Sequence, residues 1–391
     1  MPYPTLDTPS VLVDLDLLER NIAEMAEVAR RAGVALRPHI KTHKTPRIAQ
    51  TCRANGIAWR PHTKGQKTPE IAHAEIAAGA IGVTCAKLGE AEVLADAGIR
   101  DIFVCFPLVT ELKVRRLAAL ARRATLSTIA DSQQGVAALS AVFAGEPAPL
   151  DVLVKVDTGL HRVGVAPGAA TVELARRVAA APGLRFAGVC AHEGYTYGAA
   201  DAAERAALAR RGAETLVATA RELAAAGLPC ARVSTGSTPG AGAAAGVAGV
   251  TEMRPGNYVF YDAMQVGLGV VPPERCALRV LVTVVSHAAR DRAVVDGGSK
   301  TFTSDTGAHG MTAAGGHGIV VGKEGVRLEK LSEEHGWLAL DPAGDDVAIG
   351  EQLAIIPVHS CPVANLAPEL VLVRQGALVD RWPVAAQGRV R

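Results

Sequence analysis

The stretch Arg37-Pro38-His39-Ile40-Lys41 returns later in the chain as Arg60-Pro61-His62-Thr63-Lys64. When residues 30–50 are aligned with residues 53–73, more than half of the positions are identical, so a short segment occurs twice. Each copy starts as a short apolar run typical of a strand, reaches a lysine, and continues into a helix start. Parallel barrels place their chemistry at the carboxyl ends of their strands. Lysine also forms Schiff bases with carbonyl compounds, so one of these lysines is the first candidate for a catalytic residue.

The composition limits the classes of protein to which the chain can belong. It has 391 residues, of which 49% are apolar and only 4% aromatic, so a large core of small side chains is possible. The formal net charge is +2 and no basic run occurs, so we expect no nucleic-acid partner. We expect no membrane span or signal peptide, because no uninterrupted apolar stretch is long enough and the start lacks an apolar core. Seven widely spaced cysteines argue against a disulfide framework and favour a cytoplasmic protein.

Short apolar runs alternate with alanine-rich helical stretches over the first two thirds of the chain. With one strand from the repeated segment they make eight β/α units, which is the number in a TIM-type barrel. The sequence therefore predicts a (β/α)8 barrel over residues 15–264, with a duplicated strand–helix segment at residues 30–73. The other seven candidate strands are residues 81–86, 101–106, 126–130, 150–156, 185–191, 231–234 and 251–260.

After about residue 265 the pattern changes to valine-rich alternating runs separated by Gly, Asp and Pro, which indicates antiparallel strands. We therefore predict a smaller C-terminal antiparallel β domain of residues 265–391, joined by an N-terminal strand within residues 1–14. Its candidate strands are residues 278–286, 293–296, 318–321, 352–356 and 370–374.

Polar and glycine-rich clusters follow four successive predicted barrel strands. Asp157-Thr158-Gly159 leads to Arg162, and His192-Glu193-Gly194-Tyr195 follows the next strand. Residues 234–240 read Ser-Thr-Gly-Ser-Thr-Pro-Gly, and residues 254–258 read Arg-Pro-Gly-Asn-Tyr. Such loops can be ordinary turns, but their N–H groups and hydroxyls can also hold a phosphate, often after the last two strands of a barrel. A lysine on the same rim favours the phosphate site.

In this order and spacing, the motifs resemble the D-threonine aldolase/D-serine dehydratase family. The resemblance extends over nearly the whole chain and includes His359-Ser360-Cys361-Pro362 near its end. Members are pyridoxal-phosphate enzymes with an alanine-racemase-like barrel and a C-terminal β domain. The resemblance implies a homodimeric lyase that uses pyridoxal 5'-phosphate and a divalent metal and acts on small D-β-hydroxy-α-amino acids.

The resemblance also implies roles residue by residue. The lysine after Arg-Pro-His-x would hold pyridoxal phosphate as a Schiff base and later move the substrate α-proton. Arg162 and Tyr195 would lie against the cofactor ring or its phenolic oxygen, and Arg254 would approach the ring nitrogen. The cofactor phosphate would be held by Ser234, Thr235, Gly236, Gly256 and Asn257.

Both repeated lysines are candidates for the Schiff base. Lys64 is followed by its helix and the rest of the barrel without interruption, which favours Lys64. Lys41 is followed by Thr42-His43-Lys44, a continuation more frequent in the family. The unused copy is expected to be a surface strand and helix or an excursion from the barrel.

His359 and Cys361 are the predicted metal ligands. They are two positions apart at the expected end of a strand, and both suit zinc, with manganese or magnesium as alternatives. A bare His-x-Cys more often binds no metal, but the resemblance favours one, because family members carry a metal at this place. The metal would act as a Lewis acid on the substrate β-hydroxyl.

The residue at position 361 bears on the type of reaction. Family members that cleave the carbon–carbon bond tend to carry aspartate there, and members that eliminate the hydroxyl carry cysteine. We therefore favour dehydration of a substrate such as D-serine, D-threonine or D-3-hydroxyaspartate to a keto acid and ammonia. The alternative is retro-aldol cleavage to glycine and an aldehyde, for which His192 is a candidate base. Alanine racemases pair the lysine with a tyrosine from the β domain of a partner subunit, and the predicted β domain here has no tyrosine, which disfavours an amino-acid racemase. A non-catalytic pyridoxal-phosphate-binding barrel is also disfavoured, because such barrels lack a β domain.

Overall fold

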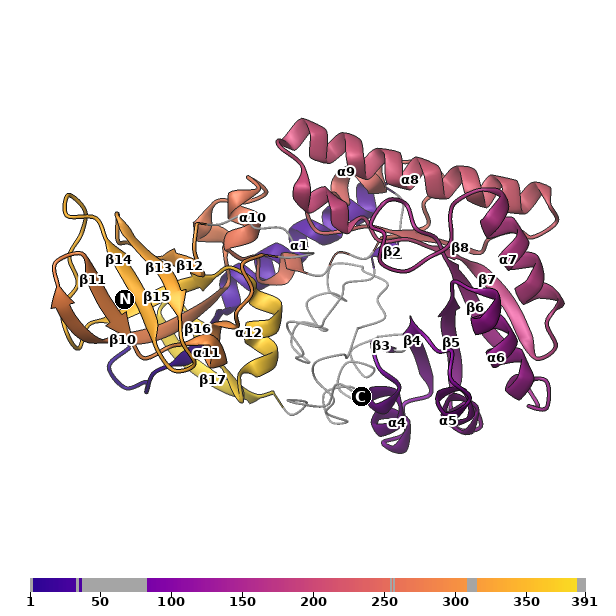
Figure 1. Ribbon diagram of the computed structural model, residues 1–391, viewed down its shortest axis with the longest axis horizontal. Helices are drawn as coiled ribbons and strands as arrows, with labels where there is room; N and C mark the ends of the chain where they lie inside the picture. Colours follow the sequence, from indigo (N-terminus) through magenta and orange to yellow (C-terminus); the bar gives the residue numbers. More distant parts are fainter. Residues whose placement is uncertain are drawn as a thin grey trace. The chain divides into compact units, whose positions relative to one another are not determined.

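The computed structural model describes residues 3–32, 35–36, 83–253, 255, 257–307 and 315–384 (Figure 1). The contacts within the chain divide it into two compact units. Ala23–Gly256 forms the unit called here the parallel-sheet unit, and Met1–Ile22 with Asn257–Gly388 forms the antiparallel-sheet unit. The division falls within helix α1 (Leu15–Ala32). Among the described helices, none is both long and apolar enough to cross a membrane.

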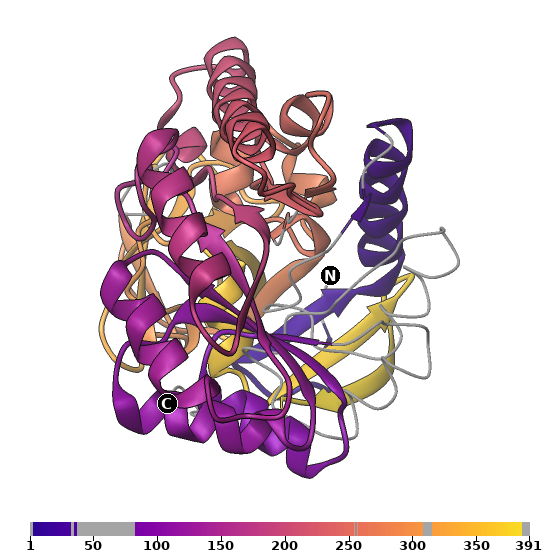
Figure 2. The same ribbon diagram turned by 90° about the vertical axis from the view of Figure 1, so that its right-hand side faces the viewer.

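The described residues of the parallel-sheet unit form eight strands in the order β2-β9-β8-β7-β6-β5-β4-β3. Every neighbouring pair in this sheet is parallel. Figure 2 shows its strands fanning out with the helices on one side. The strands are β2 (Ala35–Leu36), β3 (Val83–Cys85), β4 (Asp101–Pro107), β5 (Thr125–Ala130), β6 (Leu150–Lys155), β7 (Leu184–Cys190), β8 (Arg232–Thr235) and β9 (Glu252–Met253).

Helices follow the strands of this sheet, as in a chain of β/α units. Two of them begin at side-chain caps: Ser132 accepts a hydrogen bond from the N–H of Gly135, and Asp201 accepts one from the N–H of Glu204. The helices are α4 (Leu88–Asp96), α5 (Glu111–Ala121), α6 (Gln133–Phe143), α7 (Ala169–Ala180), the 3-10 turn η2 (Gly194–Gly198), α8 (Ala202–Ala225) and α9 (Ala241–Ala245).

Successive residues of the strands point to opposite faces of the sheet and bury apolar side chains on both. Ile102 and Val104 belong to the large core that the helices cover. Phe103, between them, belongs to a separate cluster with Ile129 and Leu153 on the other face. Polar groups at the carboxyl ends of these strands therefore start from a rigid, packed base.

In the antiparallel-sheet unit, the residues that the structure describes form nine strands in the order β11-β14-β13-β12-β15-β10-β1-β16-β17. An additional pairing of β11 with β10 closes the first six strands into a ring. β1 lies between β10 and β16 and is parallel to β16. The strands are β1 (Ser10–Asp14), β10 (Leu278–Ala289), β11 (Arg292–Val295), β12 (Gly318–Val320), β13 (Val326–Leu331), β14 (Gly336–Leu340), β15 (Gln352–Pro357), β16 (Glu369–Arg374) and β17 (Ala377–Pro383).

Short helices connect these strands, and two details differ from the sequence expectations. The predicted last barrel strand, residues 251–260, is β9 followed by a 3-10 turn, η3 (Asn257–Val259). The sequence did not predict strands β13, β14 and β17. In β13 and β17, the many charged or exposed side chains hide the alternating apolar pattern. The remaining helices are α10 (Ala263–Gly267), η4 (Pro273–Arg275), α11 (Ser299–Phe302) and α12 (Ser360–Leu366). A parallel α/β sheet with an antiparallel β domain after it confirms the predicted fold class.

Candidate active site

The predicted site residues fall into three groups. Lys41, Lys64, Arg254 and Gly256 lie outside the described residues. Asn257, His359 and Cys361 belong to the antiparallel-sheet unit. The parallel-sheet unit contains the others, which are Arg162, His192, Tyr195, Ser234, Thr235 and Gly236.

The loop after β6 is organised by the carboxylate of Asp157. Its Oδ1 accepts hydrogen bonds from the backbone N–H groups of Gly159 at 2.9 Å, Leu160 at 2.9 Å and His161 at 3.0 Å. Burial opposes ionisation of Asp157, but these N–H groups and His161 prevail, and its pKa lies below its ordinary value. Arg162 follows directly on this fixed turn and is exposed.

Tyr195, on η2, packs beside that loop. Its hydroxyl donates to Oγ1 of Thr158 at 3.4 Å, and its ring lies within 4 Å of the position that a Cβ would take on Gly159. Burial raises the pKa of Tyr195 to about 12. The phenol is therefore protonated at neutral pH and acts as a hydrogen-bond donor.

The loops after β7 and β8 are joined by hydrogen bonds. Nδ1 of His192 lies 3.4 Å from the carbonyl oxygen of Gly236. The carboxylate of Glu193 accepts a hydrogen bond from the Thr235 hydroxyl and one from the Gly236 N–H at 2.7 Å. His192, Thr235 and Gly236 thus lie together, as expected from the sequence. Glu193 had no predicted role, since nothing in its local sequence reveals a partner 42 positions away.

The antiparallel-sheet unit holds a second polar cluster, centred on Asp262. This carboxylate is fully buried and accepts hydrogen bonds from Nδ2 of Asn257 at 2.6 Å, from the Ser360 N–H at 3.0 Å and from the Gln265 N–H at 3.2 Å. Burial raises its pKa above the ordinary value, although His359 and the hydrogen bonds oppose this. Asp262 therefore fixes the start of α12 and the side chain of Asn257.

His359 closely follows the end of a strand, as the sequence suggested, but Cys361 lies in the first turn of α12, a helix that the sequence did not predict. β15 ends at Pro357, and His359 is the residue that caps α12. Nδ1 of His359 lies 2.9 Å from Oδ2 of Asp305, and Nδ2 of Asn257 lies 3.9 Å from Sγ of Cys361. The sequence predicted that Asn257 binds phosphate. In the structure, its side-chain amide nitrogen contacts Ser360 and Cys361.

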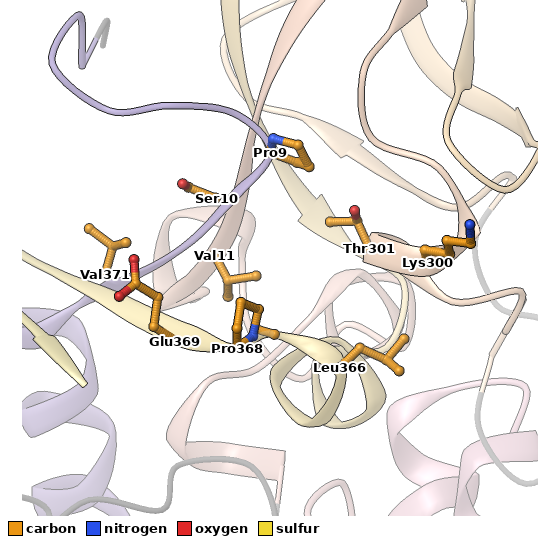
Figure 3. Close-up of a pocket in the computed structure, with 10 residues that line it drawn as sticks. Pro9, Ser10, Val11, Lys300, Thr301, Leu366, Pro368, Glu369 and Val371 are labelled. Atoms are coloured by element: carbon orange, nitrogen blue, oxygen red, sulfur yellow. The ribbon is translucent and has the colours of Figure 1, made fainter. Parts of the chain in front are cut away.

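A separate pocket of about 190 Å³ lies in the same unit, between the start of β1, α11 and the segment from α12 to β16 (Figure 3). Its lining includes Ser10, Lys300, Leu366 and Glu369. None of the predicted site residues lines it, so it does not belong to either cluster. Across the described part of the chain, no group of three or more His, Cys, Asp or Glu side chains is arranged to hold a metal.

Comparison with known proteins identifies the family. Residues 62–263 match the family model described as alanine racemase, N-terminal domain, and residues 277–373 match the putative serine dehydratase domain. The D-threonine aldolase of Arthrobacter sp. is 33% identical to this chain over 99% of it and 94% of the aldolase. The chain belongs to the D-threonine aldolase/D-serine dehydratase family. Its enzymes are pyridoxal-phosphate-dependent lyases, so the predicted family and enzyme class are confirmed.

Two solved structures from this family share the fold over nearly the whole chain. The D-threonine aldolase of Filomicrobium marinum has a TM-score of 0.81 and 34% identity, with 99% of this chain and 97% of that chain covered. The D-threo-3-hydroxyaspartate dehydratase of Delftia sp. HT23 has a TM-score of 0.80 and 34% identity, with 97% of each chain covered. Two further structures of a D-threo-3-hydroxyaspartate dehydratase contain a histidine-to-alanine mutation and a cysteine-to-alanine mutation, the latter in the metal-free form. The two mutated residues are two positions apart in that chain.

Proposed function

We propose that this enzyme is a pyridoxal-phosphate- and zinc-dependent dehydratase of D-β-hydroxy-α-amino acids. The observation that carries the proposal is the pair His359 and Cys361 at the start of α12, with Oδ2 of Asp305 against Nδ1 of the histidine. A D-threo-3-hydroxyaspartate dehydratase has a histidine and a cysteine at the same spacing, both of which have been replaced by alanine, and the cysteine mutant has been solved in a metal-free form.

The loop after β8 fits the phosphate of pyridoxal phosphate. Ser234 and Thr235, the last two residues of β8, and Ser237 in the loop are almost completely buried, and Gly236 has a φ of +118°, which turns the backbone sharply at this point. Clustered hydroxyls and N–H groups in a turn of this kind are suited to an anion. When bound, the cofactor would withdraw electrons from the substrate α-carbon.

Either repeated lysine can provide the Schiff base. β2 leads directly into Arg37, and it pairs in parallel with β9 through Ala35 and Glu252, which supports Lys41. The match to the alanine racemase N-terminal domain begins at residue 62, within the second copy, which supports Lys64. We propose that one of them binds the cofactor and, as a neutral amine, accepts the substrate α-proton.

The donor set around His359 fits a metal ion. With the ring hydrogen on Nδ1 and donated to Asp305, the lone pair for a metal is on Nε2, and the carboxylate fixes the ring orientation. Cys361 contributes a thiolate, and a nitrogen with a sulfur favours zinc over magnesium. Two protein ligands leave positions for water and for the substrate β-hydroxyl, whose departure a Lewis acid would assist.

The second candidate function is retro-aldol cleavage, and the position of His192 favours keeping it. If Nδ1 of His192 donates to the Gly236 carbonyl oxygen, Nε2 is the basic atom that can accept a proton from a β-hydroxyl. Retro-aldol cleavage requires such a base, whereas dehydration requires the hydroxyl to leave.

Product analysis separates the two reactions. The purified enzyme is supplied with pyridoxal phosphate, zinc and D-threonine, with L-threonine as the control substrate. We expect 2-oxobutanoate and ammonia from D-threonine alone. Acetaldehyde and glycine as the main products would establish the aldolase instead, and no reaction with any D-β-hydroxy amino acid would reject both.

Borohydride trapping followed by peptide mapping identifies the lysine. We expect the reduced cofactor on Lys41 or Lys64, and a label on neither would reject the cofactor assignment. We also propose that the enzyme is a cytoplasmic homodimer, as the family resemblance implies, and sedimentation velocity tests the dimer.

A further inference from the structure

In addition to the contact of His192 with Gly236, hydrogen bonds join the segments after β7 and β8 at two places within the parallel-sheet unit. At the first, the carboxylate of Glu193 accepts hydrogen bonds from the hydroxyl of Thr235 and the N–H of Gly236. At the second, Oγ1 of Thr196 donates to the carbonyl oxygen of Glu193 at 2.7 Å and shares a hydrogen bond with Oγ of Ser237 at 2.9 Å. The residues after β8 are therefore held from one side by the segment that follows β7.

These contacts are shielded from water. Glu193, Thr196 and Thr235 have no exposed surface, and Ser237 is only 3% exposed. A hydrogen bond between a buried carboxylate and its donors is stronger than one at the surface, and removing the carboxylate leaves the donors unsatisfied. Glu193 thus has a large effect on the conformation of Thr235 and Gly236.

The same contacts divide the donors of the loop into two sets. The Thr235 hydroxyl and the Gly236 N–H are used by Glu193. Within the described residues, the backbone N–H groups of Ser237 and Gly240 donate to no acceptor. These N–H groups lie further along the same turn, so the shape set at Gly236 determines where they point.

We propose that Glu193 is a positioning residue: its hydrogen bonds hold Thr235 and Gly236 in place, so that the rest of the loop is shaped for the cofactor phosphate before the cofactor binds. The inference rests on the proposed function for the identity of the anion. A loop that is ordered in advance loses less conformational entropy on binding, and the phosphate therefore binds more tightly.

The decisive experiment compares two ligands that differ only in the phosphate. Binding of pyridoxal phosphate and of pyridoxal is titrated by absorbance in wild type, Glu193→Ala, Glu193→Gln and the control Glu173→Ala. Glu173 is an exposed carboxylate on α7 that pairs with Arg177. Glu193→Ala is expected to weaken the binding of pyridoxal phosphate about 10- to 100-fold, because the lost interactions involve a buried charged group. The binding of pyridoxal is expected to be unchanged.

Glu193→Gln distinguishes positioning from charge. The glutamine amide has the same shape: its oxygen can accept from Gly236, and its nitrogen can donate to a rotated Thr235 hydroxyl. We expect Glu193→Gln to bind pyridoxal phosphate with an affinity close to that of the wild type. Tighter binding of pyridoxal phosphate by both variants would overturn the inference, because it would mean that the carboxylate repels the phosphate. Equal binding by wild type and Glu193→Ala would also overturn it and leave the proposed function intact.

A second measurement does not depend on the cofactor. Hydrogen exchange of the apo-enzyme, followed by mass spectrometry of peptides covering residues 232–241, reports directly on the loop. We expect faster exchange at Gly236 in Glu193→Ala and no change in Glu173→Ala, with α8 exchanging normally in both. Unchanged exchange at the loop would refute the role of Glu193, whereas a wild type that binds no pyridoxal phosphate would refute the proposed function.

Discussion

Gly212, on α8, leaves the space in which Tyr195 and Glu193 lie. A Cβ on this glycine would stand 2.1 Å from the Tyr195 hydroxyl, 3.0 Å from Cγ of Glu193 and 3.4 Å from Cζ of Tyr195. Ordinary contact between such atoms is about 3.5 Å, so the hydroxyl must move by more than about 1 Å. Gly212→Ala therefore tests whether the ring of Tyr195 is held in this position.

Two effects of known size oppose each other in this substitution. Alanine in a helix interior is favoured over glycine by about 1 kcal/mol. Overpacking a well-filled site costs about 1–3 kcal/mol, and the contact at the hydroxyl is at the severe end. We expect Gly212→Ala to lower the free energy of unfolding by about 1–2 kcal/mol. In a Tyr195→Phe background the hydroxyl is absent, and the same change should be neutral or stabilise by up to about 1 kcal/mol.

The four proteins of this double-mutant cycle are unfolded with urea as apo-enzymes, and the helical circular dichroism signal is used to monitor unfolding. The coupling between the two sites should reach about 2 kcal/mol, because the severe 2.1 Å contact exists only when both the Cβ and the hydroxyl are present, whereas the 3.0 Å contact with Cγ of Glu193 is the same in both backgrounds. Equal destabilisation by Gly212→Ala in both backgrounds would show that Tyr195 does not occupy this space.

Three further outcomes follow from the two clusters. Asp305→Asn should weaken zinc binding about 10- to 100-fold, because the ring of His359 loses the carboxylate that orients it. Competition with a chromophoric chelator measures the affinity, and an unchanged affinity would show that Asp305 does not support the metal site. Cys361→Ala should abolish turnover of D-threonine while the absorbance of bound pyridoxal phosphate persists, and retained turnover would remove the metal hypothesis. Burial raises the pKa of Tyr195 to about 12 from an ordinary 10.0, so the folded state holds the phenolic proton more tightly than the unfolded state. The free energy of unfolding should therefore fall as the pH rises from about 10 to about 12, and it should fall less in Tyr195→Phe. Urea unfolding midpoints measured at several alkaline pH values test this. Equal shifts in the two proteins would contradict the raised pKa of Tyr195.

The parts of the fold that the sequence predicted are those with local signals. Alternating apolar strands and alanine-rich helices between residues 81 and 234 produced β/α units close to those observed. Polar loops after the strands also came together, as His192, Thr235 and Gly236 show. Both results depend only on periodicity and on the shared direction of parallel strands.

The missing parts depend on contacts between distant residues. Glu193 acts on a loop 42 positions later, and Asp305 meets a histidine 54 positions later, so neither has a local signature. His359 was expected at a strand end because the preceding apolar run is a strand, but the capping of α12 is completed by Asp262, 98 positions earlier. The duplicated lysines lie outside the described residues, and local sequence supports both copies.

The place of β1 between β10 and β16 has a consequence for synthesis on the ribosome. β1 is made before both of its partners, Leu278–Ala289 and Glu369–Arg374. Both edges of β1 therefore stay unpaired while the whole intervening parallel sheet and its helices are translated. A C-terminal fragment released by proteolysis would lack the strand that joins its six-stranded ring to β16 and β17, and its exposed strand edges would favour aggregation.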